Sequence, residues 1–149
     1  MHPVSDNFSS NSADLVVIGA GPAGLAAATE AARSGAAVIV VDESPRPGGR
    51  LPGQVHPERG RGRWSDGAAK ARQLAAAAVE TGVRIVCGAS VWGLFPGWYT
   101  AVTPVDGCSD PPPGFESRAL LLAAGASQLP LLLPGWTTPG VLCAGAVQA

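Results

Sequence analysis

The stretch that decides the fold runs from Leu15 to Ala28 and reads Leu-Val-Val-Ile-Gly-Ala-Gly-Pro-Ala-Gly-Leu-Ala-Ala-Ala. An apolar run of strand length is followed by three glycines in the pattern G-x-G-x-x-G, and an alanine-rich helical segment comes directly after them. Gly19 permits a tight turn, Gly21 lacks a Cβ that would hold a diphosphate away, and Gly24 lets the helix approach the sheet. The free amides of the first helical turn, at the positive end of the helix dipole, then form a diphosphate site.

A second strand and an acid follow in the order that a dinucleotide-binding unit requires. Gly35 ends a helix predicted over residues 22–34, and residues 36–42 form a continuous apolar run, typical of a parallel strand covered on both faces. Asp42 lies 42 − 19 = 23 residues after the first glycine, where such folds grip a ribose diol. Glu43 is the neighbouring candidate, although it should point away from the crevice. The alternative, a glycine-rich turn in an α/β protein that binds no nucleotide, leaves this ordered series unexplained.

The next loop indicates which dinucleotide is bound. Residues 44–50 contain two prolines that stiffen the loop and the pair Gly48-Gly49, which lets its backbone approach a ligand closely. NAD-binding domains have no general need for such a pair. With this loop, the chain resembles the FAD-binding half of the pyridine nucleotide–disulfide oxidoreductase superfamily, where the loop passes the FAD diphosphate. Residues 119–126 resemble that superfamily's second signature, in which a strand ends in a small residue and a glycine beside the flavin.

A narrower resemblance rests on residues 42–49, 88–92, 124–141 and 144–148 and spans about residues 14–148. Together these motifs are similar to the FAD-binding α subunits of opine oxidases, D-hydroxyproline dehydrogenases and hydrogen cyanide synthase. The resemblance implies oxidation of the C–N bond of an amino acid or amine within a hetero-oligomer that contains a second flavoprotein subunit. Two residues depart from the group's pattern: Ala124 replaces a threonine, and Arg50 replaces a glutamine.

The same resemblance completes the predicted cofactor site. It implies that main-chain groups near Val91, with Ser90 as the next candidate, pair with the adenine edge. No catalytic acid or base is assigned, because Asp42 is the one carboxylate beside the predicted flavin and is committed to the ribose. We expect FAD to be held by Gly19, Gly21, Pro22, Ala23, Gly24, Asp42, Glu43, Gly48, Gly49, Arg50, Val91, Ala124 and Gly125.

The predicted fold class is α/β: a Rossmann-like FAD-binding fold with a parallel sheet, helices and a small β-meander crossover. Further elements are a helix capped at 65–66 and running to about 81, a strand over 83–87, meander strands over 91–94 and 98–102, and a returning strand over 118–123. We expect residues 1–13 to be a disordered arm, residues 14–128 the FAD-binding domain, and residues 129–149 the start of a bridge to a second domain.

Composition excludes several classes of protein. The 149 residues suit one domain, and a net charge of −1 with 14% charged residues offers no surface for nucleic acid. No apolar run is long enough for a membrane span. Cys87, Cys108 and Cys143 form no C-x-x-C pair, which argues against a redox-active disulfide and favours reduced thiols in the cytoplasm. Two histidines, His2 and His56, make no case for a metal site.

The sequence leaves three functions open. The first is the FAD-binding part of a dehydrogenase acting on amines or amino acids, with this chain a fragment, a truncated product or a stand-alone flavin-binding protein. The second is an NAD(P)H-dependent flavin reductase lacking its second domain, and the third is a non-catalytic flavin-binding remnant. Trp92, Trp98 and Tyr99 are expected to pack on the sheet, with flavin stacking as the alternative. The arginine-rich loop over residues 51–63 is expected to be solvated, with a phosphate or partner contact as the alternative.

Overall fold

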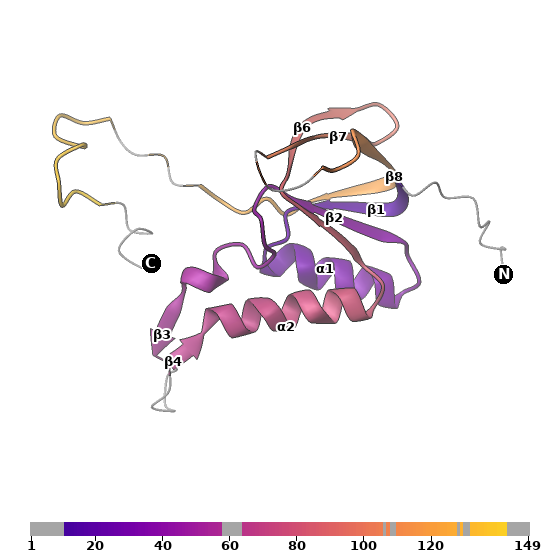
Figure 1. The fold of residues 1–149 in the computed structure, drawn as a ribbon, viewed down its shortest axis with the longest axis horizontal. Coiled ribbons are helices and arrows are strands. Elements are labelled where there is room, and N and C mark those ends of the chain that lie inside the picture. The colour runs from indigo at the N-terminus through magenta and orange to yellow at the C-terminus, as the bar shows by residue number, and fades with distance from the viewer. Residues whose placement is uncertain are drawn as a thin grey trace.

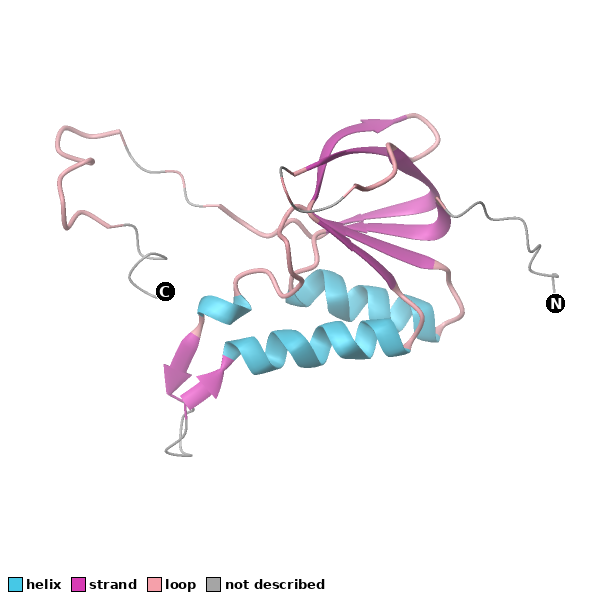
Figure 2. Cartoon of the chain, in the orientation of Figure 1, coloured by secondary structure: helices cyan, strands magenta, loops and turns pink. Residues whose placement is uncertain are grey.

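The computed structural model describes residues 11–57, 64–105, 107, 110–127, 129 and 132–142. The main helices and strands form three layers, and residues 132–142 lie apart from them (Figure 1). Two helices lie on one face of a parallel sheet, and an antiparallel meander lies over the other face (Figure 2). The sheet order is β5-β2-β1-β8-β7-β6, and β3 pairs separately with β4. The elements are β1 (Ser12–Ile18), α1 (Pro22–Arg33), β2 (Val38–Asp42), the 3-10 turn η1 (Leu51–Gly53), β3 (Val55–Pro57), β4 (Trp64–Asp66), α2 (Gly67–Glu80), β5 (Arg84–Cys87), β6 (Ala89–Phe95), β7 (Tyr99–Pro104) and β8 (Gly114–Leu122).

The centre of the molecule is the parallel pair β1–β2, in which Leu15 faces Val38 and Ile18 faces Val41. Val16 and Val17 are fully buried, so both faces of β1 are covered. This explains why these strands are continuous apolar runs rather than alternating ones. The parallel partners β5 and β8 add to the two sides of this pair, and all four strands end at one edge of the sheet, here called the carboxyl edge.

The helical layer is built from small side chains. Leu25 and Ala28 of α1 and Ala78 of α2 pack with Val17 and Val40 of the sheet in one buried cluster. Each alanine brings the helix backbone close to its neighbour, and the two helices lie side by side along the sheet (Figure 1). The Asp66 side chain caps α2 by accepting a hydrogen bond from the Ala69 amide at 2.9 Å, as the sequence predicts.

The meander closes the opposite face. Phe115 and Val102 are buried there against Val16 and Val41, with Ala89 at the start of β6. β8 joins both layers, because its first residues pair with β7 and the following ones pair with β1. This double pairing makes β8 begin at Gly114, four residues before the predicted start.

The structure confirms the predicted fold class and adds two features. Residues 55–57, predicted as part of a solvated loop, pair with residues 64–66, of which 65–66 were predicted as a helix cap, and form the short hairpin β3–β4. The hairpin is too brief to leave a periodic sequence signal. Ser12 and Ala13, assigned to the disordered arm, belong to β1 because they pair with Glu116 and Ser117. Residues 1–10 of that arm lie outside the described residues. No helix in the described residues has the length and apolarity needed to cross a bilayer.

Candidate functional site

The glycine turn after β1 is held by contacts within the protein. Gly19 has a φ of +107°, and its amide donates to the Val41 carbonyl at 2.8 Å. A Cβ on Gly19 would lie 2.3 Å from the Ala123 carbonyl oxygen, and one on Gly24 would lie 1.9 Å from the Gly19 carbonyl oxygen. Both glycines are therefore required by the approach of α1 and β8 to the end of β1.

Gly21 differs from both of these glycines. Its φ of −73° and ψ of 179° are ordinary extended values that any L-residue adopts. A Cβ built on it meets no protein atom within 4 Å. Neither backbone strain nor packing requires a glycine at this position. Its missing side chain instead leaves open space directly in front of the first turn of α1.

The first turn of α1 presents unsatisfied backbone donors to this space. Gly21 is the N-cap and supplies no side-chain hydrogen bond, and the first turn contains no acidic residue. Pro22 occupies the first helical position, so one of the orphan N–H groups is removed at no cost. The following amides, beginning with Ala23, have no intrahelical acceptor and point along the helix axis at its positive end. The turn thus fits an anion.

Asp42 lies beside this turn at the end of β2. One carboxylate oxygen accepts a hydrogen bond from the Ala20 amide at 2.5 Å, and the other accepts from the Ser44 amide at 2.8 Å. The half-buried carboxylate is therefore directed toward the glycine turn, whereas Glu43 is exposed. The amides of Ala20 and Ser44 were not predicted, because a main-chain donor leaves no mark on residue type.

The loop after β2 is fastened to the same turn. The Gly48 amide donates to the Ala20 carbonyl at 2.8 Å, and a Cβ on Gly49 would lie 3.0 Å from the Gly21 Cα. A Cβ on Gly48 would lie 2.5 Å from the Ala71 Cβ of α2. The pair has positive φ values of +122° and +57°. Gly-Gly is thus the sequence that lets this loop pass between α2 and the glycine turn.

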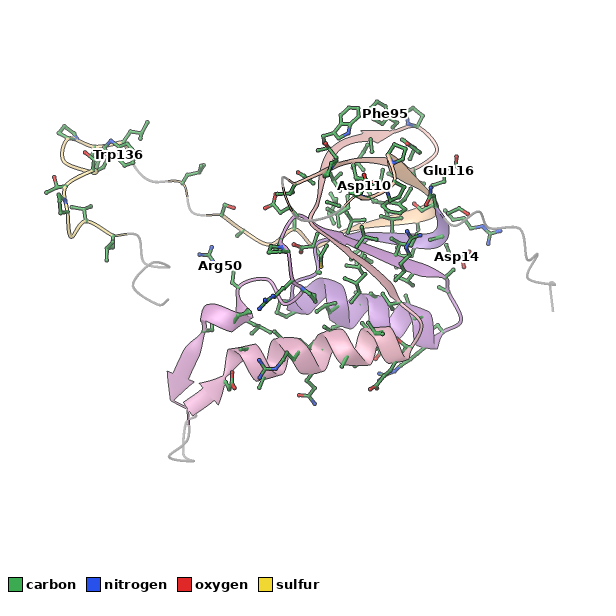
Figure 3. All side chains as sticks on the ribbon, in the orientation of Figure 1. Asp14, Arg50, Phe95, Asp110, Glu116 and Trp136 are labelled. Carbon is green, nitrogen blue, oxygen red and sulfur yellow. The ribbon has the colours of Figure 1, made fainter. Side chains whose placement is uncertain are left out.

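The residues after β8 complete the carboxyl edge. Ala124 follows the point where β8 touches Gly19, and Gly125 has a φ of +74° with open space around its absent Cβ. An Arg50 guanidinium nitrogen lies 3.4 Å from the Ala126 carbonyl oxygen and donates a hydrogen bond to it, joining this segment to the Gly-Gly loop. Figure 3 shows the Arg50 side chain on the α1 side of that segment.

The position of Val91 gives weaker support for its predicted contact with the adenine than the positions of the other residues give for theirs. It lies in β6 opposite Val102, and its partly buried side chain packs against the core between sheet and meander. Its position in the strand that follows β5 and Gly88 is compatible with a main-chain role near the carboxyl edge. The predicted cofactor residues from the glycine turn, the β2 end, the Gly-Gly loop and the end of β8 are brought together, whereas Glu43 and Val91 lie at the margin.

A thiol also faces this edge. Cys87 ends β5 and is the register partner of Asp42. Burial, and secondarily the negative charge of Asp42, raise the pKa of the Cys87 thiol above its ordinary value of 9.0. A raised pKa favours the protonated thiol over the thiolate at neutral pH. Cys108 and Cys143 lie outside the described residues.

The comparisons with known proteins agree with this geometry. Residues 13–145 match the family described as pyridine nucleotide-disulphide oxidoreductase. The chain belongs to this family. It is 42% identical over 146 residues to an opine oxidase subunit from Agrobacterium tumefaciens (strain Ach5), an alignment that covers 91% of this chain and 28% of the relative. It is 34% identical to the alpha subunit of sarcosine oxidase from Corynebacterium sp. (strain P-1), covering 91% of this chain and 15% of that relative.

A solved structure supports the fold independently. A thioredoxin reductase from Gloeobacter violaceus superposes with a TM-score of 0.64 at 28% identity, covering 85% of this chain and 41% of that one. The chain is thus an FAD-binding domain of this family, and the predicted cofactor and fold are confirmed. Its relatives are named as subunits, which indicates multi-subunit enzymes. The chain spans 28% of the length of the opine oxidase relative and 15% of the length of the sarcosine oxidase relative.

Proposed function

We propose that this chain is the FAD-binding part of a dehydrogenase that oxidises C–N bonds of amino acids, opines or related amines. The observation that carries the proposal is Gly21, whose side-chain-free position serves no contact within the protein but opens the start of α1. The substrate class is supported by the similarity to the opine oxidase and sarcosine oxidase relatives.

Different residues of the chain would bind different parts of FAD. The first-turn amides of α1 would bind the diphosphate, and the carboxylate of Asp42 would accept the hydroxyl hydrogens of the ribose. Main-chain groups near Val91 would pair with the adenine, and the open turn at Gly125 would flank the isoalloxazine. FAD, when bound, supplies the acceptor for a hydride taken from the substrate carbon.

These residues position the flavin, and the proposed substrate contacts lie elsewhere. Within the described residues, Asp42 is the carboxylate that points at the site, and it is already bonded to two amides. We therefore assign the binding of the amine to a second flavoprotein subunit or to a further domain reached through residues 129–149. The FAD-binding domain would extend over residues 14–128, in a protein that works in the cytoplasm.

Anaerobic reduction tests this function. The protein, expressed alone and together with a candidate second flavoprotein subunit, would be loaded with FAD and titrated with opines, N-methylated amino acids and NADH. We expect the flavin absorbance to bleach with an amine and to remain with NADH. Bleaching by NADH alone would identify a flavin reductase, and a protein that takes up no FAD would contradict the proposal.

A further inference from the structure

Four aromatic side chains form a partly exposed surface on the meander, here called the aromatic surface: Trp92, Phe95, Trp98 and Tyr99. The Trp92 and Phe95 rings meet edge to face with centroids 5.5 Å apart, and Phe95 and Tyr99 follow at 6.4 Å. Trp92 stands at a bulge in β6, where the pairing with β7 shifts between Val91 and Gly93. Trp92 remains 64% exposed and Trp98 51% exposed, so packing within the protein covers only part of each side chain.

Trp98 is held in a conformation that its residue type disfavours. Its φ of +57° is the one positive value recorded for a non-glycine in the described residues. The hairpin turn would accept glycine or asparagine at this position more readily than a bulky side chain. Because 51% of Trp98 stays exposed, burial within the fold accounts for only part of the preference for a tryptophan here. Backbone strain kept at an exposed aromatic residue points to a role outside the chain.

A hollow of about 500 Å³ adjoins the aromatic surface and shares Tyr99 with it. The hollow is also lined by Glu116 and Arg118 at the start of β8 and by Ser12 at the start of β1. Arg118 pairs with Asp14 at 3.1 Å. Among the described residues no Lys, Arg or His lies within ion-pair distance of the Glu116 carboxylate, which is exposed.

The hollow and the turn at Trp98, whose carbonyl accepts a hydrogen bond from the Ser117 hydroxyl, lie away from the glycine turn, whereas Trp92 directly follows Val91 in β6. Ser12 begins β1 and Gly19 follows its last residue, a separation of about 20 Å along a strand. In Figure 3, Glu116 and Asp14 lie at one end of the sheet and Arg50 at the other. A protein bound to the aromatic surface would therefore leave the glycine turn and the Gly-Gly loop accessible.

We propose that the aromatic surface and its hollow bind the second subunit of the enzyme, an inference that rests on the proposed function. The relatives' names as subunits require such a partner. Residues 89–105 contain no charged side chain, so this part of the interface matches an apolar, uncharged patch. Glu116 at its border matches a lysine or arginine of the partner. The exposed tryptophans and the half-buried Tyr99, which lines the hollow, are residue types that dominate binding energy at protein interfaces.

Trp98→Asn provides a variant that should keep the fold. Asparagine accepts the left-handed conformation, so the variant is expected to unfold at the same temperature as the wild type or higher. Association would be measured by titrating a tagged candidate second flavoprotein subunit with the FAD-loaded chain. We expect Trp98→Asn to weaken the affinity about ten-fold or more and Glu116→Gln about two- to five-fold.

The matched control is Trp136→Asn, which removes an exposed indole from the segment after β8 and should leave the affinity unchanged. All variants should retain FAD in wild-type amount. Wild-type affinity in Trp98→Asn and Glu116→Gln, or absence of a complex with the wild-type chain, would overturn the proposal. Sedimentation of the chain alone as a dimer that Trp98→Asn dissociates would assign the surface to a second copy instead. Failure of the wild type to bind FAD would contradict the proposed function but not this interface.

Discussion

The carboxyl edge of the parallel sheet and the β6–β7 meander present different kinds of surface. At the carboxyl edge the site consists of main-chain groups, with Gly19, Gly21 and Gly49 removing side chains and Asp42 holding two amides. On the meander the surface consists of side chains, with the rings of Trp92, Phe95 and Tyr99 in a row and Tyr99 lining a polar hollow. The first construction suits a small anionic ligand, and the second suits a protein. The difference indicates that cofactor binding and the association of the two proteins can be altered separately.

The largest effect is expected from the glycines of the carboxyl edge. Gly24→Ala would place a methyl group 1.9 Å from the Gly19 carbonyl oxygen, where only backbone movement can relieve the overlap. We expect the variant to lose about 3 kcal/mol or more of unfolding free energy. Gly21→Ala should lose less than about 1 kcal/mol, because it meets no atom and changes only the helix cap. Urea unfolding of both variants measures the contrast, and equal losses would show that the two glycines do not differ as described.

Asp42→Asn tests whether Asp42 binds the adenosine part of FAD. If the carboxylate accepts the ribose hydroxyls as proposed, its loss should weaken the binding of FAD and ADP about ten- to one hundred-fold. FMN, which carries no adenosine, should bind the variant and the wild type equally. Equilibrium titration with the three ligands separates these outcomes. An equal loss for FMN would mean that the substitution disturbs the glycine turn through the Ala20 amide instead.

Thr100→Val tests how the buried side chains of the meander contribute to stability. The Thr100 side chain is fully buried, and its hydroxyl oxygen has no hydrogen-bond partner among the described residues. Replacing the hydroxyl with a methyl group should stabilise the protein by about 1 kcal/mol, because an unsatisfied buried polar group is removed. Thermal unfolding measures the change. A destabilised variant would indicate that the hydroxyl does have a partner.

The smallest effect concerns the Cys87 thiol at the carboxyl edge. Burial and then the charge of Asp42 raise the pKa of Cys87 above 9.0, so the folded protein holds this proton more tightly than the unfolded chain. Its contribution to stability is complete below pH 9.0 and is lost as the pH rises through the folded pKa. We expect slow alkylation of Cys87 by iodoacetamide at about pH 8, where the thiol stays protonated, followed by peptide mass spectrometry. Alkylation as fast as that of the urea-unfolded chain would contradict a raised pKa.

The same contrast explains what could be predicted from the sequence. The parallel sheet and the glycine turn were predictable, because continuous apolar runs and glycine spacing record local backbone needs. The bonds from Ala20 and Ser44 to Asp42 were not, because any residue carries an amide. The aromatic surface was interpreted as sheet packing, since the sequence does not reveal how much of Trp92 or Trp98 remains exposed. The strain at Trp98 likewise depends on a turn geometry that residue types alone do not specify.

The central claim is that the open position at Gly21 receives the FAD diphosphate, and Gly21→Ser tests it most directly. Serine is a better N-cap than most residues, and its hydroxyl would occupy the first-turn amides that the phosphates need. Titration of FAD, followed by flavin absorbance and fluorescence, should give binding to the wild-type chain and an affinity at least about one hundred-fold weaker in the variant. Both proteins should unfold at similar temperatures. Equal FAD affinity in two folded proteins would contradict the account.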